Sequence, residues 1–143
     1  LHVVPSRTIP QGIAAMLAYN EEDALQSNIH AMEEALESVQ TIQITTAVRS
    51  SSVGGLKISK GQNIALAEDR IVAVGNSPWS VIQEALNKDE VSTGAHIDIF
   101  WGANTDERDA REIAACLEPA FPGEVEVHHG GQPFYKYILS VTE

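Results

Sequence analysis

The 143-residue sequence carries 20 acidic against 9 basic side chains, a net charge of −11, and 43% hydrophobic residues. This excess of negative charge argues against nucleic acid and anionic membrane surfaces as partners, because both attract clustered Lys and Arg. The single cysteine, Cys116, excludes an internal disulfide and a cysteine-based zinc cluster. No apolar run approaches about 18 residues and no signal peptide is visible, so we predict one acidic cytoplasmic domain without an integral membrane segment.

The start of the chain predicts the end of a strand followed by a helix. The chain begins in an apolar run without an initiator Met, which indicates a piece of a longer protein, and Val3 and Val4 resemble a strand end. Thr8 and Gln11 have capping-box spacing, and Pro10 suits a first helical turn. An anion can bind where a strand and a polar turn lead into a helix N-terminus. The alternative interpretation of this segment is an ordinary capped helix.

A second helix is predicted from Asn20, because the acids of 21–23 would occupy its first turn. An apolar stripe at helical spacing is expected to face the core. Its members are Leu25, Ile29, Met32, Leu36 and Val39.

The middle of the chain alternates polar and apolar residues. This pattern predicts a strand over 41–49 and a β-meander over 56–58, 63–67 and 70–74. Arg49 ends the first strand, and its guanidinium suits carboxylate or phosphate. A salt bridge to one of the many acids is the alternative.

The last half predicts a strand–helix–strand unit. A helix capped by Ser77 and Pro78 precedes a polar loop over 87–94, a strand over 96–101, a helix capped by Thr105 and a strand over 125–127. The two strands should be parallel, and Cys116 should be buried. His96 and Asp98 share a strand face and should form a polar pair. The fold class is therefore α/β, a mixed sheet with helices packed on it.

Near the end lies His128-His129-Gly130-Gly131-Gln132-Pro133, between predicted strands. Such a loop can present N–H groups to a ligand or partner, or can simply turn the chain. By alternation His128 shares a face with two glutamates, whereas His129 follows the valine face. The sequence contains no HExxH, GxSxG or Walker pattern, so we predict no catalytic or metal site.

Three segments in this order resemble one family. The segments are 3–15, which contains Thr-Ile-Pro-Gln-Gly, 46–49 together with Lys60-Gly61, and 128–135. They are similar to the C-terminal part of the bacterial fatty acid kinase A protein, which is a dihydroxyacetone-kinase-like fusion protein. The resemblance implies that residues 1–143 are a single domain, a C-terminal fragment with the fold of a DegV-like C-terminal lobe. It leaves open whether 1–20 are the end of a preceding DegV-like lobe.

The resemblance also implies a function. The parent would be an ATP-dependent fatty acid kinase whose N-terminal domain binds ATP and Mg²⁺, with no cofactor in this fragment. The fragment would be a non-catalytic module that docks a fatty-acid-carrying DegV-family protein for acyl phosphate formation, and a homodimer of the parent is a further expectation. The candidate ligand- or partner-binding residues are Arg49, His128, His129, Gly130, Gly131, Gln132, Tyr135, Thr8, Gln11 and Gly12.

Two alternatives stay open. DegV proteins carry a His-Thr-Gly-Pro-Gly block that His128 and Gly130 match, whereas His129, Gly131 and Gln132 depart from it. A DegV-like lobe of this kind would bind a fatty-acid carboxylate through His128 and Arg49. In the second alternative, His128 or His129 relays phosphate or a proton.

Overall fold

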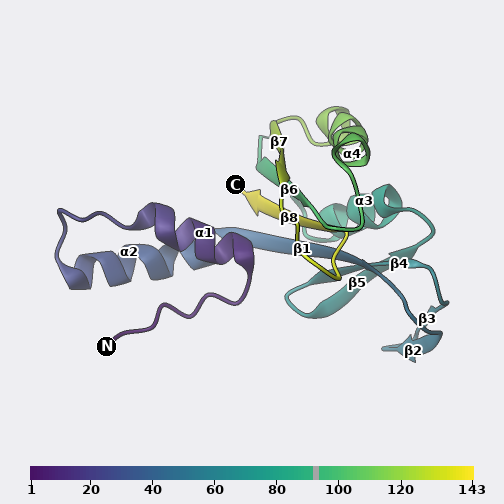
Figure 1. Cartoon of the computed structure of the whole chain (residues 1–143), viewed down its shortest axis with the longest axis horizontal. Helices are drawn as coiled ribbons and strands as arrows, with labels where there is room; N and C mark the ends of the chain where they lie inside the picture. The colour runs from purple at the N-terminus through teal and green to yellow at the C-terminus, as the bar shows by residue number, and fades with distance from the viewer. Residues whose placement is uncertain (92–93) are drawn as a thin grey trace.

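The computed structural model describes residues 1–91 and 94–143. Its largest element is a six-stranded mixed sheet in the order β5-β4-β1-β8-β6-β7 (Figure 1). Figure 1 labels these strands, which are β1 (Val39–Thr46), β4 (Asn63–Ala67), β5 (Arg70–Gly75), β6 (His96–Trp101), β7 (Glu124–His129) and β8 (Tyr137–Thr142). The predicted α/β class with a mixed sheet is confirmed.

Strands β6 and β7 pair in parallel, as the strand–helix–strand pattern predicted, and the other neighbours in the sheet are antiparallel. The predicted β-meander is wrong in one respect. Strand β1 pairs directly with β4, while β2 (Ser51–Val53) and β3 (Leu56–Ile58) form a separate hairpin. Ala47 N donates to Gln62 O and Gly61 N donates to Ala47 O, each at 2.9 Å, so the chain between Ala47 and Gly61 loops out of the sheet and carries this hairpin; β1 ends at Thr46, before Arg49.

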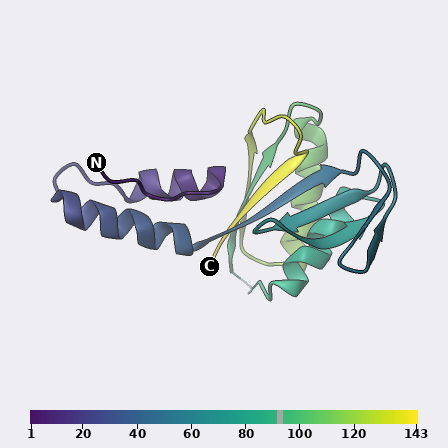
Figure 2. The same ribbon diagram turned by 90° about the horizontal axis from the view of Figure 1, so that it is seen from below.

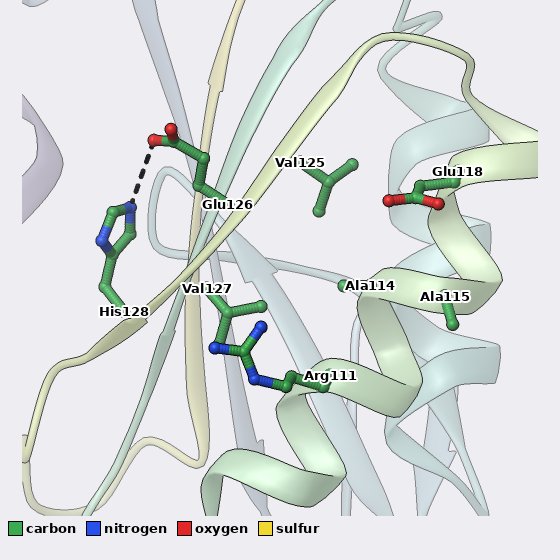
Figure 3. A pocket seen from close by; sticks show the side chains of 8 residues that line it. All are labelled: Arg111, Ala114, Ala115, Glu118, Val125, Glu126, Val127 and His128. Atoms are coloured by element: carbon green, nitrogen blue, oxygen red, sulfur yellow. Dashed lines mark ion pairs between the residues drawn. The ribbon is translucent and has the colours of Figure 1, made fainter.

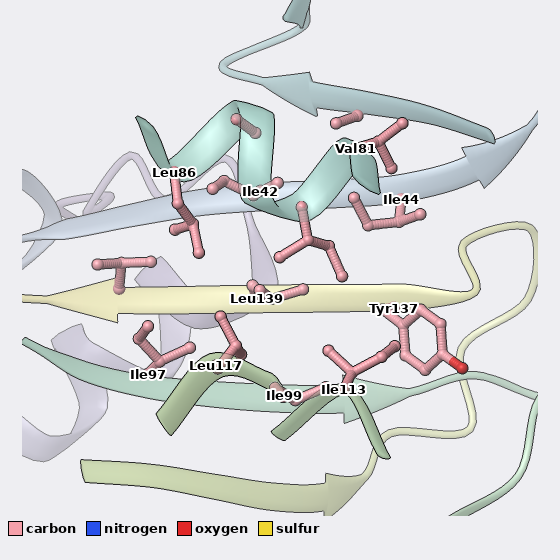
Figure 4. Close-up of a cluster of buried hydrophobic side chains, with 14 of the residues drawn as sticks. Ile42, Ile44, Val81, Leu86, Ile97, Ile99, Ile113, Leu117, Tyr137 and Leu139 are labelled. Carbon is pink, nitrogen blue, oxygen red and sulfur yellow. The ribbon is translucent and has the colours of Figure 1, made fainter. Parts of the chain in front are cut away.

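Helices α3 (Pro78–Lys88) and α4 (Glu107–Ala120) cover one face of the sheet (Figure 2). Ser77 caps α3 as predicted, by accepting a hydrogen bond from Ser80 N. The core lies between these helices and the sheet, where apolar side chains from alternate strand positions meet them (Figure 4). Its fully buried members include Ile42, Ile82, Leu86, Ile97, Ile99, Leu117 and Leu139.

Three predictions in this half need correction. Helix α4 is capped by Asp106, whose carboxylate accepts from Asp109 N at 2.8 Å, and not by Thr105, which donates instead to the Gly102 and Lys136 carbonyls. Cys116 is exposed rather than buried, because it lies beside the buried positions of α4 and not among them. The predicted loop over 87–94 begins later, since α3 continues to Lys88, and residues 92–93 lie outside the described part.

Helices α1 (Ile9–Ala18) and α2 (Leu25–Glu37) lie side by side as a helical hairpin that stands out from one end of the sheet (Figures 1 and 2). Helix α2 starts at Leu25 and not at Asn20. The cause is Asn28, whose side-chain amide bonds the Asn20 backbone N–H and carbonyl, each at 2.9 Å, and holds that segment as a turn.

The predicted core-facing stripe of α2 is only partly buried. Leu36 and Val39 are buried, but Leu25 is 70% exposed because the hairpin extends beyond the sheet. The strand expected at Val3 and Val4 is also wrong. Residues 1–7 contain no strand, and Ser6 N donates to Val4 O in a local turn. Within the described residues, the helices are too short or too polar to cross a membrane.

Candidate functional site

The glycine-rich 130–133 loop links β7 to β8 and closes on the end of β6. Gly130 N and Gly131 N both donate to Trp101 O at 3.0 Å. The buried side-chain amide of Gln132 donates to Phe100 O at 3.0 Å and to Tyr135 O at 3.4 Å. The donors that the sequence offered to a ligand are therefore used inside the protein, to hold three strand ends together.

The two adjacent histidines point to opposite faces of the sheet, as their alternation predicted. The His128 ring stacks on Phe100 with centroids 5.0 Å apart, and its Nε2 lies 2.7 Å from Asp98 Oδ1. The His129 ring lies against Trp101 with centroids 4.2 Å apart. Only His128 therefore belongs to the polar face of the sheet.

A cluster of five ionisable side chains forms where β6 and β7 pair. We call it the β6–β7 cluster; it consists of His96, Asp98, Glu124, Glu126 and His128. The predicted His96–Asp98 pair is present, with Nε2 and Oδ1 3.2 Å apart. The parallel register sets His96 beside Glu124 and Asp98 beside Glu126.

Figure 3 shows how two members of this cluster, Glu126 and His128, lie relative to helix α4. Glu126 and His128 extend from β7 on the side away from α4, whereas Val125 and Val127 face Arg111 and the rest of the helix. A hollow of about 480 Å³ lies between this edge strand and α4. Desolvation alone would lower the pKa of His96, but Asp98, Glu124 and Glu126 outweigh it and raise that pKa above its usual value.

A second hollow, of about 700 Å³, lies where the start of α1 meets β1. We call it the α1–β1 hollow. Its lining brings together three predicted residues, Thr8, Gln11 and Tyr135, from opposite ends of the chain. Thr8 Oγ1 and Thr41 Oγ1 lie 2.9 Å apart and tie the helix to the strand. The remaining lining residues are Pro5, Arg7, Glu37, Gln43, Glu68 and Asp69.

The predicted site residues are thus divided among separate places. Thr8, Gln11 and Tyr135 share the hollow, with Gly12 one residue farther along α1. Arg49 is exposed in the loop after β1 and makes no ion pair within the described part of the chain. Strands β8 and β6 separate β1 from β7, so the strand that precedes Arg49 lies roughly 14 Å from the strand that carries His128.

Sequence reasoning missed the full β6–β7 cluster and the acidic lining of the hollow. A signal for the cluster was present, because polar residues alternate in both strands of the strand–helix–strand unit. If the two strands are taken as neighbours in the sheet, the polar residues of one strand lie beside those of the other. No comparable signal pointed to the hollow, because Glu68 and Asp69 occupy an ordinary hairpin turn.

Comparison with known proteins adds three findings. Residues 1–143 match a family model that describes the C-terminal domain of proteins like fatty acid kinase A. The chain is 36% identical over 140 residues to an uncharacterized protein of Staphylococcus epidermidis, covering 97% of the chain and 25% of that relative. It is 31% identical over 140 residues to one of Staphylococcus aureus, covering 97% of the chain and 26% of that relative.

The chain therefore spans about a quarter of the length of these curated relatives. Among solved structures, a DegV family protein from Corynebacterium glutamicum matches with a TM-score of 0.55 and 15% identity. The match covers 93% of this chain and 58% of that one. It confirms the DegV-like fold.

Proposed function

The chain belongs to the fatty acid kinase A-like C-terminal family, and from this we propose that it is the non-catalytic C-terminal module of a fatty acid kinase A-type protein. Its task in this proposal is to dock a DegV-family protein that carries the fatty acid. ATP and Mg²⁺ would bind elsewhere in the parent, and the acyl phosphate would form there.

The charge of the α1–β1 hollow supports a docking role. Glu37, Glu68 and Asp69 line it, and Arg7 is the cation beside them. Three carboxylates against one guanidinium repel a fatty-acid carboxylate or a phosphate, but they attract a basic patch on a protein partner and speed its association. This acidic lining is the observation that carries the docking proposal.

Direct binding of a fatty-acid carboxylate by this chain is less well supported. His128 Nε2 already lies 2.7 Å from Asp98 Oδ1 and 3.7 Å from Glu126 Oε2, and these two carboxylates would repel a carboxylate ligand. Arg49 follows β1, which two intervening strands separate from β7, so one carboxylate would not reach both side chains. A relay role for His128 or His129, and a homodimer of the parent, stay predictions.

The docking proposal is tested by neutralising the hollow in the full-length parent. Glu68→Gln with Asp69→Asn removes two charges and keeps side chains of similar size. Asn tolerates the positive φ of residue 69, and Gln carries the same backbone strain as the glutamate it replaces. We expect capture of a DegV-family fatty-acid-binding protein to weaken several-fold, mostly through slower association, while ATP turnover stays normal. Surface plasmon resonance at low and high salt measures both effects.

The matched control is Glu112→Gln with Glu118→Gln, which removes two exposed charges from α4 on the other side of the sheet. This control should capture the partner as the unmodified parent does. Equal capture by the two double variants would overturn docking through the hollow.

A further inference from the structure

We propose that the β6–β7 cluster is a binding site for a zinc-class divalent transition-metal ion. The ligands are His96 Nε2, Asp98 Oδ1 and Glu126 Oε2, and the site is independent of the docking surface proposed above. These three atoms all lie within 4.8 Å of one another. They come from adjacent strands whose parallel register sets them side by side.

The two distances from His96 Nε2 to the carboxylate oxygens match the needs of a small tetrahedral ion. His96 Nε2 lies 3.2 Å from Asp98 Oδ1 and 3.6 Å from Glu126 Oε2. Zinc bonds of about 2.0–2.2 Å in a tetrahedron place neighbouring ligand atoms roughly 3.3 Å apart. An ion can therefore enter with small side-chain movements and without a change in the backbone.

The surroundings of His96 give a second reason. Both of its ring nitrogens face carboxylates, since Nδ1 lies 3.1 Å from Glu124 Oε2 while Nε2 faces Asp98 and Glu126. With Nε2 on a metal ion, Nδ1–H donates to Glu124, which is the carboxylate–histidine–metal arrangement that orients ligating imidazoles. A bound cation also offsets the negative charge of three neighbouring carboxylates.

His128 supports the site by holding a ligand in place. Its Nε2 lies at hydrogen-bond distance from Asp98 Oδ1, and its stacking on Phe100 orients the ring. The fourth metal position is then left for water or a small ligand. Access is available, because the side chains of His96, Asp98 and Glu126 are 33%, 20% and 57% exposed.

The mixed ligand set indicates the class of ion. Imidazole with carboxylates suits zinc and its neighbours, whereas Mg²⁺ and Ca²⁺ prefer oxygen ligands alone. The sequence carried no helical metal motif, because these ligands follow the two-residue period of strands. Zn²⁺ is therefore the probe, with Mg²⁺ and Ca²⁺ as competitors.

Isothermal titration of the 143-residue chain with ZnCl₂ tests the proposal. We expect one Zn²⁺ per chain and no displacement by a large excess of Mg²⁺ or Ca²⁺. His96→Ala and Glu126→Gln should weaken zinc affinity by at least about 100-fold, and Glu124→Gln by about 10- to 100-fold, as for other partners of ligating histidines. Glu126 is largely exposed, so we expect Glu126→Gln to fold even if His96→Ala does not. Circular dichroism shows whether each variant is folded.

The matched control is His30→Ala. His30 on α2 also faces a carboxylate, with Nε2 3.7 Å from Glu34 Oε2, but it lies in an exposed helical pair. This variant should bind zinc as the unmodified chain does. The proposal is overturned if millimolar Zn²⁺ does not bind, if Mg²⁺ or Ca²⁺ displaces it, or if folded Glu126→Gln retains the affinity of the control.

Discussion

At the scale of single residues, the tightest constraint lies where the 130–133 loop folds over the end of β6. A Cβ on Gly130 would overlap Gln132 Oε1 and approach Phe100 Cβ to 3.1 Å. Gln132 has no room to retreat, because its amide is buried and bonded to two carbonyls. Glycine at position 130 is thus explained by packing, whether or not the loop also contacts a partner.

Gly130→Ala is expected to destabilise the protein by about 1–3 kcal/mol, because the added methyl group displaces the Gln132 amide. Chemical denaturation gives the free energy of unfolding. The control is Gly12→Ala in α1, where a Cβ meets only Ser6 Oγ at 3.8 Å. That change should stabilise α1 by about 0.5–1 kcal/mol, and a loss at Gly12 as large as at Gly130 would contradict this packing explanation.

Tyr137 carries the clearest pH dependence. Burial, and then Asp109, the N-cap residue Asp106 and Glu112 of α4, raise the pKa of its phenol to about 12. The unfolded chain ionises this group near pH 10, so the stability it contributes is complete below about pH 10 and lost as the pH rises towards 12. The loss is on the order of 2 kcal/mol.

Tyr137→Phe should therefore reduce the alkaline fall in stability between pH 10 and 12. Melting temperatures of both chains across this range measure the effect. A parallel fall in the two chains would show that Tyr137 is not the group responsible.

At the scale of elements, the helical hairpin of α1 and α2 is joined to the sheet by few polar contacts. Thr8 makes one of them, because its hydroxyl pairs with Thr41 Oγ1 on β1, and the same hydroxyl caps α1 by accepting from Gln11 N at 3.2 Å. Capping and tethering therefore depend on one side chain. The α1–β1 hollow depends on the same contact, because both threonines line it.

Thr8→Ala is expected to cost about 1 kcal/mol for the lost cap and a further amount for the lost tether. Ser77→Ala is the matched control, because Ser77 caps α3 by the same bond, from Ser80 N at 3.2 Å. Hydrogen exchange should show faster exchange throughout α1 in Thr8→Ala. Equal destabilisation in the two variants, with α1 protected, would mean that the threonine pair contributes nothing.

Elements set by local contacts were the ones that the sequence predicted well. Ser77 and Pro78 mark the start of α3 because the cap and the first turn involve only the next few residues. The start of α2 was misplaced, since it depends on Asn28 bonding back to Asn20. The hollow was beyond prediction for a similar reason, because Tyr135 meets Thr8 only after the whole sheet has formed.

At the scale of the whole molecule, the sheet separates two environments. One face is filled by α3, α4 and the apolar core (Figures 2 and 4). The other face carries the hollow and the β6–β7 cluster. Strand β8 contributes fully buried Leu139 to the core while it pairs with β1 and β6. Stability of the core and integrity of the polar face should therefore be lost together.

Leu139→Ala is expected to lower the free energy of unfolding by about 2–5 kcal/mol, because it opens a cavity between the sheet and both helices. Val53→Ala, on the detached β2–β3 hairpin and 48% exposed, should change it by less than about 0.5 kcal/mol. Tryptophan fluorescence and far-UV circular dichroism should give one coincident transition in Leu139→Ala. Separate transitions would show that the two halves of the sheet unfold independently.

The position of β8 also has a consequence for synthesis. Of the described strands it is made last, yet it occupies the middle of the sheet, between β1 and β6. A growing chain that has already produced β5-β4-β1 and β6-β7 holds two partial sheets, each with an unpaired edge of the kind that invites misassociation. A ribosome that stalls before residue 137 would therefore leave two partial sheets with unpaired edges on one polypeptide, and synthesis of β8 would join them into one sheet.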